Sequence, residues 1–219
     1  MRTITIKGKG KAIRNPDLVI CRISATTLEE QYDDSVVAMN KLVDDIKISL
    51  KENGFNDGDL KTVSFDINQR YGHVKKGIIN KEYQQKFLGF LIEHELKLEF
   101  DLDNVKITNL VNCLKKFSDN IEFRLVFSVK DKEGMKKDVL INATENARFN
   151  AEILAEASSV KLGKLIKIDY GWVDVNFESD TNLYNNMLSH SDTVDYSMMN
   201  INPEEIEISD NVTFIWELI

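Results

Sequence analysis

Apolar and polar residues alternate over several long stretches of the chain, and this period of two predicts β-strands. The clearest stretch places one set of residues on a single face and a charged set on the other: Leu88, Phe90, Ile92, His94, Leu96, Leu98 and Phe100 against Glu93, Glu95, Lys97 and Glu99. Such regular alternation predicts one buried and one solvated face, in an extended antiparallel ribbon. Similar patterns predict strands at residues 2–7, 18–29, 60–71, 121–129, 165–177 and 206–218.

Three other stretches repeat apolar residues every three or four positions, which is the spacing of one helix face. The first predicted helix covers about 33–53, the second begins at Asp103 or Asn104, and the third lies in the stretch that opens at residue 139. The face of the third helix consists of Leu140, Ala143, Ala147, Ala151 and Leu154. Three of these five residues are alanines, so we expect the helix backbone to lie close to its neighbour.

The predicted elements follow the order β-β-α-β-β-α-β-α-β-β, which favours an α+β fold. We expect an antiparallel or mixed β-sheet with long strands and about three helices packed on one face, in a single domain over residues 1–219. Asn15, Pro16 and Asp17 have turn chemistry, so the first two strands are predicted to form a hairpin. The apolar register of 165–177 shifts near Gly171, which predicts a bulge there.

The charge of the chain excludes some classes of partner. Lysine and arginine total 28 against 36 for aspartate and glutamate, giving a net charge of −8. This balance argues against general binding to nucleic acid or to anionic lipid, which both need clustered positive charge. No apolar run is long enough to cross a bilayer, so we expect no membrane insertion.

The first residues alternate like a strand and lack the apolar core and small-residue cleavage site of a signal peptide. We therefore expect a cytoplasmic protein. A periplasmic or cell-surface location is the alternative if a leader has been removed.

The sequence shows no set of residues arranged for catalysis. Cys21 and Cys113 lie in apolar runs without metal-ligand spacing, so buried reduced thiols are expected. His94 falls on the apolar face of its strand, where a hydrogen-bonded core histidine is the favoured interpretation. Gly8 and Gly10 flank Lys9 but lack the helix N-terminus of a phosphate-binding turn. We expect no catalytic residues, no metal site and no cofactor.

Residues 178–203 form a long polar excursion rich in asparagine, serine and aspartate. A segment of this length is either a disordered excursion or a functional flap. Its tyrosines and methionines, together with an aromatic residue just before it, are the candidate contacts to a ligand or partner: Trp172, Tyr184, Met187, Tyr196 and Met198.

Several motifs along the chain identify a family when they are taken in order. A Gly-x-Gly strand and a Pro-Asp turn occur in ITIKGKGKAIRNPDLVICRIS, and FNDGDLKTVSFDI follows the first helix. Ala147, Arg148, Ala151, Glu152 and Leu154 lie in the third helix, before the turn at Leu162 and Gly163, and INPEEIEISDNVTFIWEL closes the chain. Over nearly its whole length the chain resembles the SIMPL-domain family, which includes bacterial periplasmic immunogenic proteins. It departs from the family pattern at Phe87, where tyrosine is commoner, and at Glu205, where glycine is usual.

The resemblance implies an α+β fold and a tendency to self-assemble, and it brings no agreed catalytic residues. Relatives have been linked to oxidative-stress tolerance and, in animals, to signalling adaptors. Our leading hypothesis is a non-enzymatic, self-assembling interaction protein with a stress-related role. A homo-oligomer is the expected state, with another protein as a second kind of partner.

Two alternatives remain open at this point. One is a module that binds a small ligand or peptide and uses residues 178–203 as a flap. The other is a hydrolase or metal enzyme that uses His94 or the row of glutamates from Glu93 to Glu99.

Overall fold

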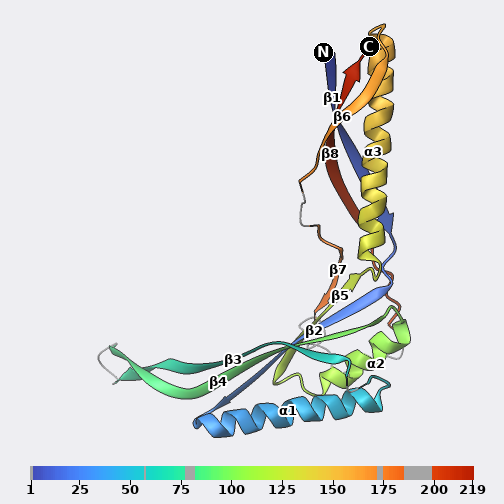
Figure 1. The fold of residues 1–219 in the computed structure, drawn as a ribbon. Helices are drawn as coiled ribbons and strands as arrows, with labels where there is room; N and C mark the ends of the chain where they lie inside the picture. The colour runs from blue at the N-terminus through green and yellow to red at the C-terminus, as the bar shows by residue number, and fades with distance from the viewer. Residues whose placement is uncertain (1, 57, 77–81, 172–174, 185–198) are drawn as a thin grey trace. The chain divides into compact units, whose positions relative to one another are not determined.

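The computed structural model describes every residue except 1, 57, 77–81, 172–174 and 185–198. Its elements are β1 (Arg2–Arg14), β2 (Leu18–Glu29), α1 (Tyr32–Glu52), β3 (Leu60–Lys76), β4 (Glu82–Asp101), α2 (Asn104–Lys115), β5 (Ile121–Ser128), α3 (Lys132–Ala157), β6 (Leu162–Asp169), β7 (Glu178–Tyr184) and β8 (Ile206–Leu218). They form two antiparallel sheets and three helices (Figure 1), which confirms the predicted α+β fold.

The chain divides into two compact units, and each is described by itself. The terminal unit comprises residues 1–17, 128–180 and 203–219, and the central unit comprises residues 18–127 and 181–202. The expectation of a single domain over 1–219 stays a prediction.

The terminal unit is a three-stranded antiparallel sheet with one long helix on its face. The strand order is β1-β8-β6, and the ladder between β1 and β8 runs from the pair Arg2 and Leu218 to the pair Arg14 and Ile206. Helix α3 lies along β1 and β8 (Figure 1). The apolar residues of β8 that face it, such as Val212 and Phe214, are buried against its alanines and alternate with less buried residues on the other face.

Helix α3 packs on the sheet through a narrow row of mostly small side chains spaced four residues apart. The buried residues are Met135, Val139, Ala143, Ala147, Ala151 and Ala155. The predicted face was therefore right at its three alanines and wrong at Leu154, which is exposed, because Ala155 continues the row in its place. Leu140 only borders this row and is half-buried.

Glycines in β1 let this helix lie directly against the strand. A Cβ atom at Gly10 would overlap the carbonyl oxygen of Val139, and one at Gly8 would overlap that of Ala143 and lie 2.6 Å from the Cβ of Ala147. The two glycines and the alanine row are thus the two sides of one close contact. Gly8 and Gly10 therefore allow the helix to pack closely. Lys9 between them lies in a strand and not in a phosphate-binding turn.

Side chains of α3 also cover part of the free edge of β1, the outer strand of this sheet. Asn142 Nδ2 donates to the carbonyl oxygen of Lys11 at 2.8 Å, and the backbone N–H of Lys9 donates to Asn146 Oδ1 at 3.1 Å. Residues four apart share a helix face and residues two apart share a strand edge, so the two spacings match. The two asparagines satisfy backbone groups that an open edge leaves to water or to another chain.

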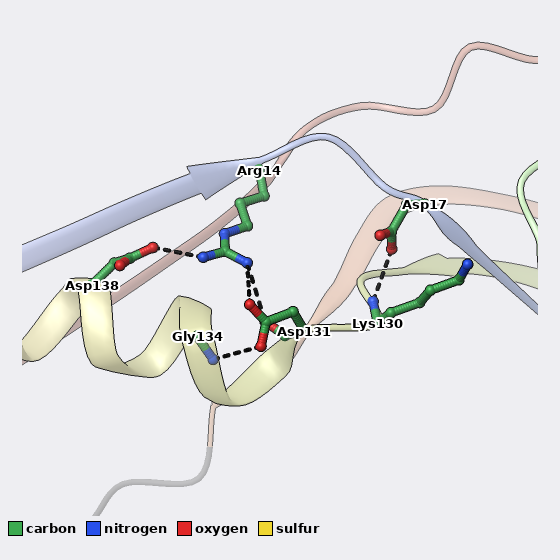
Figure 2. A network of polar contacts seen from close by, with 6 residues as sticks. All are labelled: Arg14, Asp17, Lys130, Asp131, Gly134 and Asp138. Carbon is green, nitrogen blue, oxygen red and sulfur yellow. Dashed lines mark hydrogen bonds and ion pairs between the residues drawn. The ribbon is translucent and has the colours of Figure 1, made fainter.

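An arginine-centred network ties the end of β1 to the first turns of α3 (Figure 2). Arg14 Nη1 lies 3.0 Å from Asp131 Oδ2, and Arg14 Nη2 lies 2.7 Å from Asp138 Oδ2. The other oxygen of Asp131 accepts from the backbone N–H of Gly134 at 2.8 Å and caps the helix. These bonds hold the pKa of Asp131 below its usual range, first through the Gly134 N–H and then through Arg14.

The central unit contains the five-stranded sheet, in the order β3-β4-β2-β5-β7, and the helices α1 and α2. Helix α1 packs on β2 and β4 through Met39, Val43, Ile46 and Leu50, as its sequence pattern predicts. Asp103 caps α2 by accepting from the N–H groups of Val105 and Lys106, which decides between the two predicted caps. The core between these helices and the sheet is continuous and apolar.

Two predictions about chain path were wrong. The first two strands do not form a hairpin, because β1 pairs with β8 and β2 pairs with β4. After the turn, the N–H of Asp17 donates to the carbonyl oxygen of Ser128. The carboxylate of Asp17 accepts the N–H of Lys130 (Figure 2). The strand expected over 165–177 ends at Asp169, so Gly171 lies beyond it and is not a bulge within it.

The excursion predicted at 178–203 begins with a strand. Residues Glu178–Tyr184 form β7 at one edge of the five-stranded sheet, which the polar sequence of this segment does not indicate. None of the helices in the described part of the chain has an apolar stretch long enough to cross a membrane.

Candidate functional site

The outer edge of the central sheet is its most exposed regular structure. β3 and β4 form a long two-stranded ribbon, and β3 is the last strand on this side of the sheet. The distal part of the ribbon runs beyond the N-terminal end of α1 (Figure 1). Several apolar side chains along β3 face solvent: Val63 is 64% exposed, Phe65 is 42% exposed and Tyr71 is 50% exposed. Isolated exposed apolar residues are ordinary, but a series along one uncovered edge marks a surface suited to association.

Four aromatic rings, the aromatic row, connect this ribbon to the start of α1. Tyr71 lies 5.5 Å from Phe87, Phe87 lies 5.4 Å from Phe90, and Phe90 lies 5.6 Å from Tyr32, measured between ring centroids. Each pair meets edge to face, the arrangement that aromatic quadrupoles favour. Tyr32, Tyr71 and Phe87 are all exposed, so the row presents apolar surface to solvent.

A bulge in β4 creates the aromatic row. The ladder pairs Arg70 with Gly89 and then Tyr71 with Phe87, so Leu88 has no partner in β3. Gly89 has a φ of +142°, and a Cβ there would overlap the carbonyl oxygen of Glu29. The bulge corrects the predicted alternation of β4, because Leu88 no longer shares a face with Phe90 and packs instead against Gly72.

His94 is a buried hydrogen-bonded histidine behind β3, as the sequence predicted. Its Nε2 lies 2.9 Å from Thr62 Oγ1, and the ring of Phe65 meets it edge-on at 5.0 Å. Burial lowers the pKa of His94, Lys47 lowers it further, and Glu95 opposes both. The neutral ring is therefore the favoured form, and its Nδ1 is a buried polar atom without a partner in the described structure.

The two cysteines are also buried and free, as expected. The Cys113 thiol donates to Ser49 Oγ at 3.1 Å. Burial raises the pKa of both thiols, so both stay protonated near neutral pH and are poor nucleophiles.

Charged side chains on the opposite face of β4 do not gather into a metal site. Glu93, Glu95 and Glu99 alternate along the strand, and Lys97 pairs with Glu99 at 3.0 Å. Across the described ranges, no three acidic, histidine or cysteine side chains are placed to hold one metal ion.

Of the five predicted contact residues, only one lies in the described structure. Trp172, Met187, Tyr196 and Met198 fall outside the described residues. Tyr184 ends β7 and borders a shallow depression of about 300 Å³ on the central sheet. The depression is otherwise lined by Arg22, Ser24, Glu95, Glu122, Phe123 and Arg124, so both signs of charge face it.

A second hollow, of about 400 Å³, lies in the terminal unit beside α3. Its floor is Phe214 and Trp216, whose rings stack at 5.3 Å, and Leu165 and Ile168 of β6 form one wall. Arg148 and Glu152 stand on the helix side and pair with each other at 2.9 Å. Because Arg148 is already paired, the hollow offers apolar surface without a free charge to orient a ligand.

Sequence reasoning missed the edge of β3 and the aromatic row. The alternation of Val63, Phe65 and Ile67 predicted the strand correctly, but it did not tell that Val63 and Phe65 stay exposed. Gly89, two residues after Phe87, is the signal that was available, since an isolated glycine within a strand often marks a bulge.

Comparisons with known proteins place the chain in a family without adding a site. The family model SIMPL, described as a protein of unknown function (DUF541), matches residues 4–216. No curated protein matches the chain.

Proposed function

The chain belongs to the SIMPL family, and from that premise we propose that it is a non-enzymatic interaction protein that assembles with copies of itself. The observation that carries this proposal is the edge strand β3, which no element of the described structure covers, with Phe65 and Tyr71 exposed along it. An edge strand presents backbone donors and acceptors to any other strand of suitable shape. When the edge strand also carries exposed apolar side chains, pairing with another chain both satisfies its backbone groups and buries apolar surface.

Light scattering or native mass measurement at micromolar concentration tests the proposal. We expect a mass that is a multiple of the 25.1 kDa chain and that falls on dilution. A strict monomer over this range would overturn it.

The depression beside Tyr184 favours a second candidate, a module that binds a small ligand or peptide. Its volume of about 300 Å³ is at the lower end of small-ligand sites, and its mixed charges suit a ligand that carries both an amino and a carboxylate group. Short peptides and amino acids screened by thermal shift should then raise the melting temperature. Tyr184→Ala should remove that response, whereas Tyr32→Ala, an exposed tyrosine that does not line the depression, should keep it. No shift with any compound removes this candidate.

The stress-related role and the cytoplasmic location stay proposals that come from the family resemblance and the sequence. A strain that lacks the protein and survives peroxide as well as its parent would contradict the stress-related role.

A further inference from the structure

The edge strand β3 contains a regular segment with aromatic side chains on one face and charged or polar side chains on the other. Between Ser64 and Arg70 the strand pairs with β4 without a register shift, so this segment is regular. Phe65 and Tyr71 share the face that bears His94 and the aromatic row, and Asp66, Asn68 and Arg70 alternate with them on the other face.

We propose that β3 of one chain pairs antiparallel with β3 of a second copy, about a twofold axis at Asn68. The pairing joins two five-stranded sheets into one continuous sheet. This inference rests on the proposed self-assembly and names the surface that carries it.

The register follows from the positions of the charged residues. In a twofold antiparallel pair centred on Asn68, Asp66 of each copy lies opposite Arg70 of the other. Moving the centre to Ile67 would set Arg70 opposite Ser64, and moving it to Gln69 would set Arg70 opposite Asn68. Among these three neighbouring registers, only the one centred on Asn68 pairs opposite charges, and it forms that pair twice because of the symmetry.

Among the described residues of one chain, these charges have no neutralising partner. Asp66 lies opposite Glu93 in the β3–β4 ladder, which places two carboxylates side by side, and Arg70 lies opposite Gly89. None of these three charged side chains forms an ion pair in the described structure, where the ion pair nearest along β4 joins Lys97 to Glu99. An arginine from a second copy would relieve the repulsion between Asp66 and Glu93.

The aromatic residues fit the same register. With Asn68 at the centre, Phe65 of each copy lies opposite Tyr71 of the other, on the face that carries the aromatic row. Both side chains are exposed within one chain, at 42% and 50%, so the pairing covers apolar surface that is otherwise wet. Aromatic cross-strand pairs are among the favourable pairs of antiparallel sheets.

The other edges are less suited to this pairing. β1 is covered by Asn142 and Asn146. The ladder of β6 with β8 has two register shifts within the 8 residues of β6, whereas the two shifts in the β3–β4 ladder flank the regular segment Ser64–Arg70. Bulges and irregular register blunt an edge strand against pairing. β7 is short, with 7 residues against 17 in β3.

A charge-swap series measured by native mass spectrometry and analytical ultracentrifugation tests the proposal. Asp66→Arg and Arg70→Asp each place like charges opposite each other, so each single variant should weaken association by about tenfold or more. The double variant, Asp66→Arg with Arg70→Asp, restores opposite charges and should regain the wild-type assembly. Lys41→Glu, a charge change at an exposed residue of α1 rather than on β3, serves as the control and should leave the assembly mass unchanged.

A cysteine cross-link tests the register itself. Asn68 lies opposite its own copy, so Asn68→Cys should form an intermolecular disulfide on mild oxidation. Gln69→Cys lies opposite Ile67 and should form little, and the native Cys21 and Cys113 are buried. Circular dichroism confirms that each variant is folded.

The outcomes separate this inference from the proposed function. An assembly that all the charge variants leave intact, or a cross-link at Gln69 as strong as at Asn68, overturns the β3 interface and leaves self-assembly standing. A wild-type protein that is monomeric at every concentration overturns both.

Discussion

Strands β1 and β3 both end a sheet, but the chain treats their edges in opposite ways. Helix α3 covers one face of β1 and sends Asn142 and Asn146 over its edge to bond the backbone of Lys11 and Lys9. No element of the described structure lies beyond β3, and its apolar side chains face solvent. A protein that needed both edges closed has the means to close them, as β1 demonstrates. The proposed pairing with a second copy would close the edge of β3 that the described structure leaves open.

The largest expected effect comes from breaking the covered side. In Gly10→Val, the new side chain would overlap the backbone of Val139 and push α3 away from β1. We expect the free energy of unfolding to fall by about 3 kcal/mol, the upper range for overpacking in a close contact. Urea denaturation measures this loss. Gly171→Ala, where no atom lies within 4 Å of the added Cβ, is the control in the same unit and should change little.

Removing the cover of the β1 edge should have a smaller effect. The double variant Asn142→Ala with Asn146→Ala loses two hydrogen bonds to strand backbone, so the free energy of unfolding should fall by about 2 kcal/mol. Asn150→Ala removes only a side-chain bond to Asn146 and is the matched control. If the double variant were as stable as wild type, the asparagines would not be protecting the edge.

His94 contacts Thr62 and Phe65 of β3, and its protonation should lower the free energy of unfolding. Its folded-state pKa lies below the usual 6.5, so the unfolded chain binds the proton more readily. The stabilising contribution of the neutral ring is therefore present above about pH 6.5 and is lost as pH falls through the folded-state pKa. Unfolding free energies measured between pH 8 and pH 5 should show this decline, and His94→Gln should have a flatter profile. Equal slopes for the two proteins would contradict the assignment.

The smallest effect is local and concerns single amides. The N–H of Lys9 is bonded to Asn146, so its hydrogen exchange should speed up about fivefold in Asn146→Ala, which matches loss of a bond worth about 1 kcal/mol. Amides on the uncovered edge of β3 should exchange at unchanged rates in this variant. A general rise in exchange over both units would indicate global destabilisation instead.

Periodicity alone was enough to predict most of the elements. The stripe on α1 and the alternation of β4 reflect burial on one side, and burial is what a hydrophobic pattern records. The pairing of strands depends on long-range partners, so the turn at Asn15, Pro16 and Asp17 misled the prediction of a hairpin. The short strand β7 was missed because its sequence is polar, and a polar segment does not indicate that it pairs with a sheet.

The candidate site was less accessible to sequence reasoning. An exposed phenylalanine and a buried one look alike in a strand pattern. The pattern therefore predicted that Phe65 lies in a strand, but not that its side chain is exposed. The alanines of α3 predicted a close contact correctly, but the partner of that contact, Gly8 and Gly10, is more than a hundred residues away in sequence. Asn142 and Asn146, four residues apart on one helix face, could have indicated that α3 covers a strand edge. A pattern based on apolar residues alone does not consider them.

The pairing of β1 with β8 has a consequence for the order of events on the ribosome. The ladder joins residues as distant in sequence as Arg2 and Leu218, so it is a long-range pairing. Residues 18–127 leave the ribosome long before β8 does, and α3 also emerges before β8. Newly made β1 therefore meets α3 first. The packing of Gly8 and Gly10 on α3 and the bonds of Asn142 and Asn146 to β1 can therefore form before β8 is synthesised.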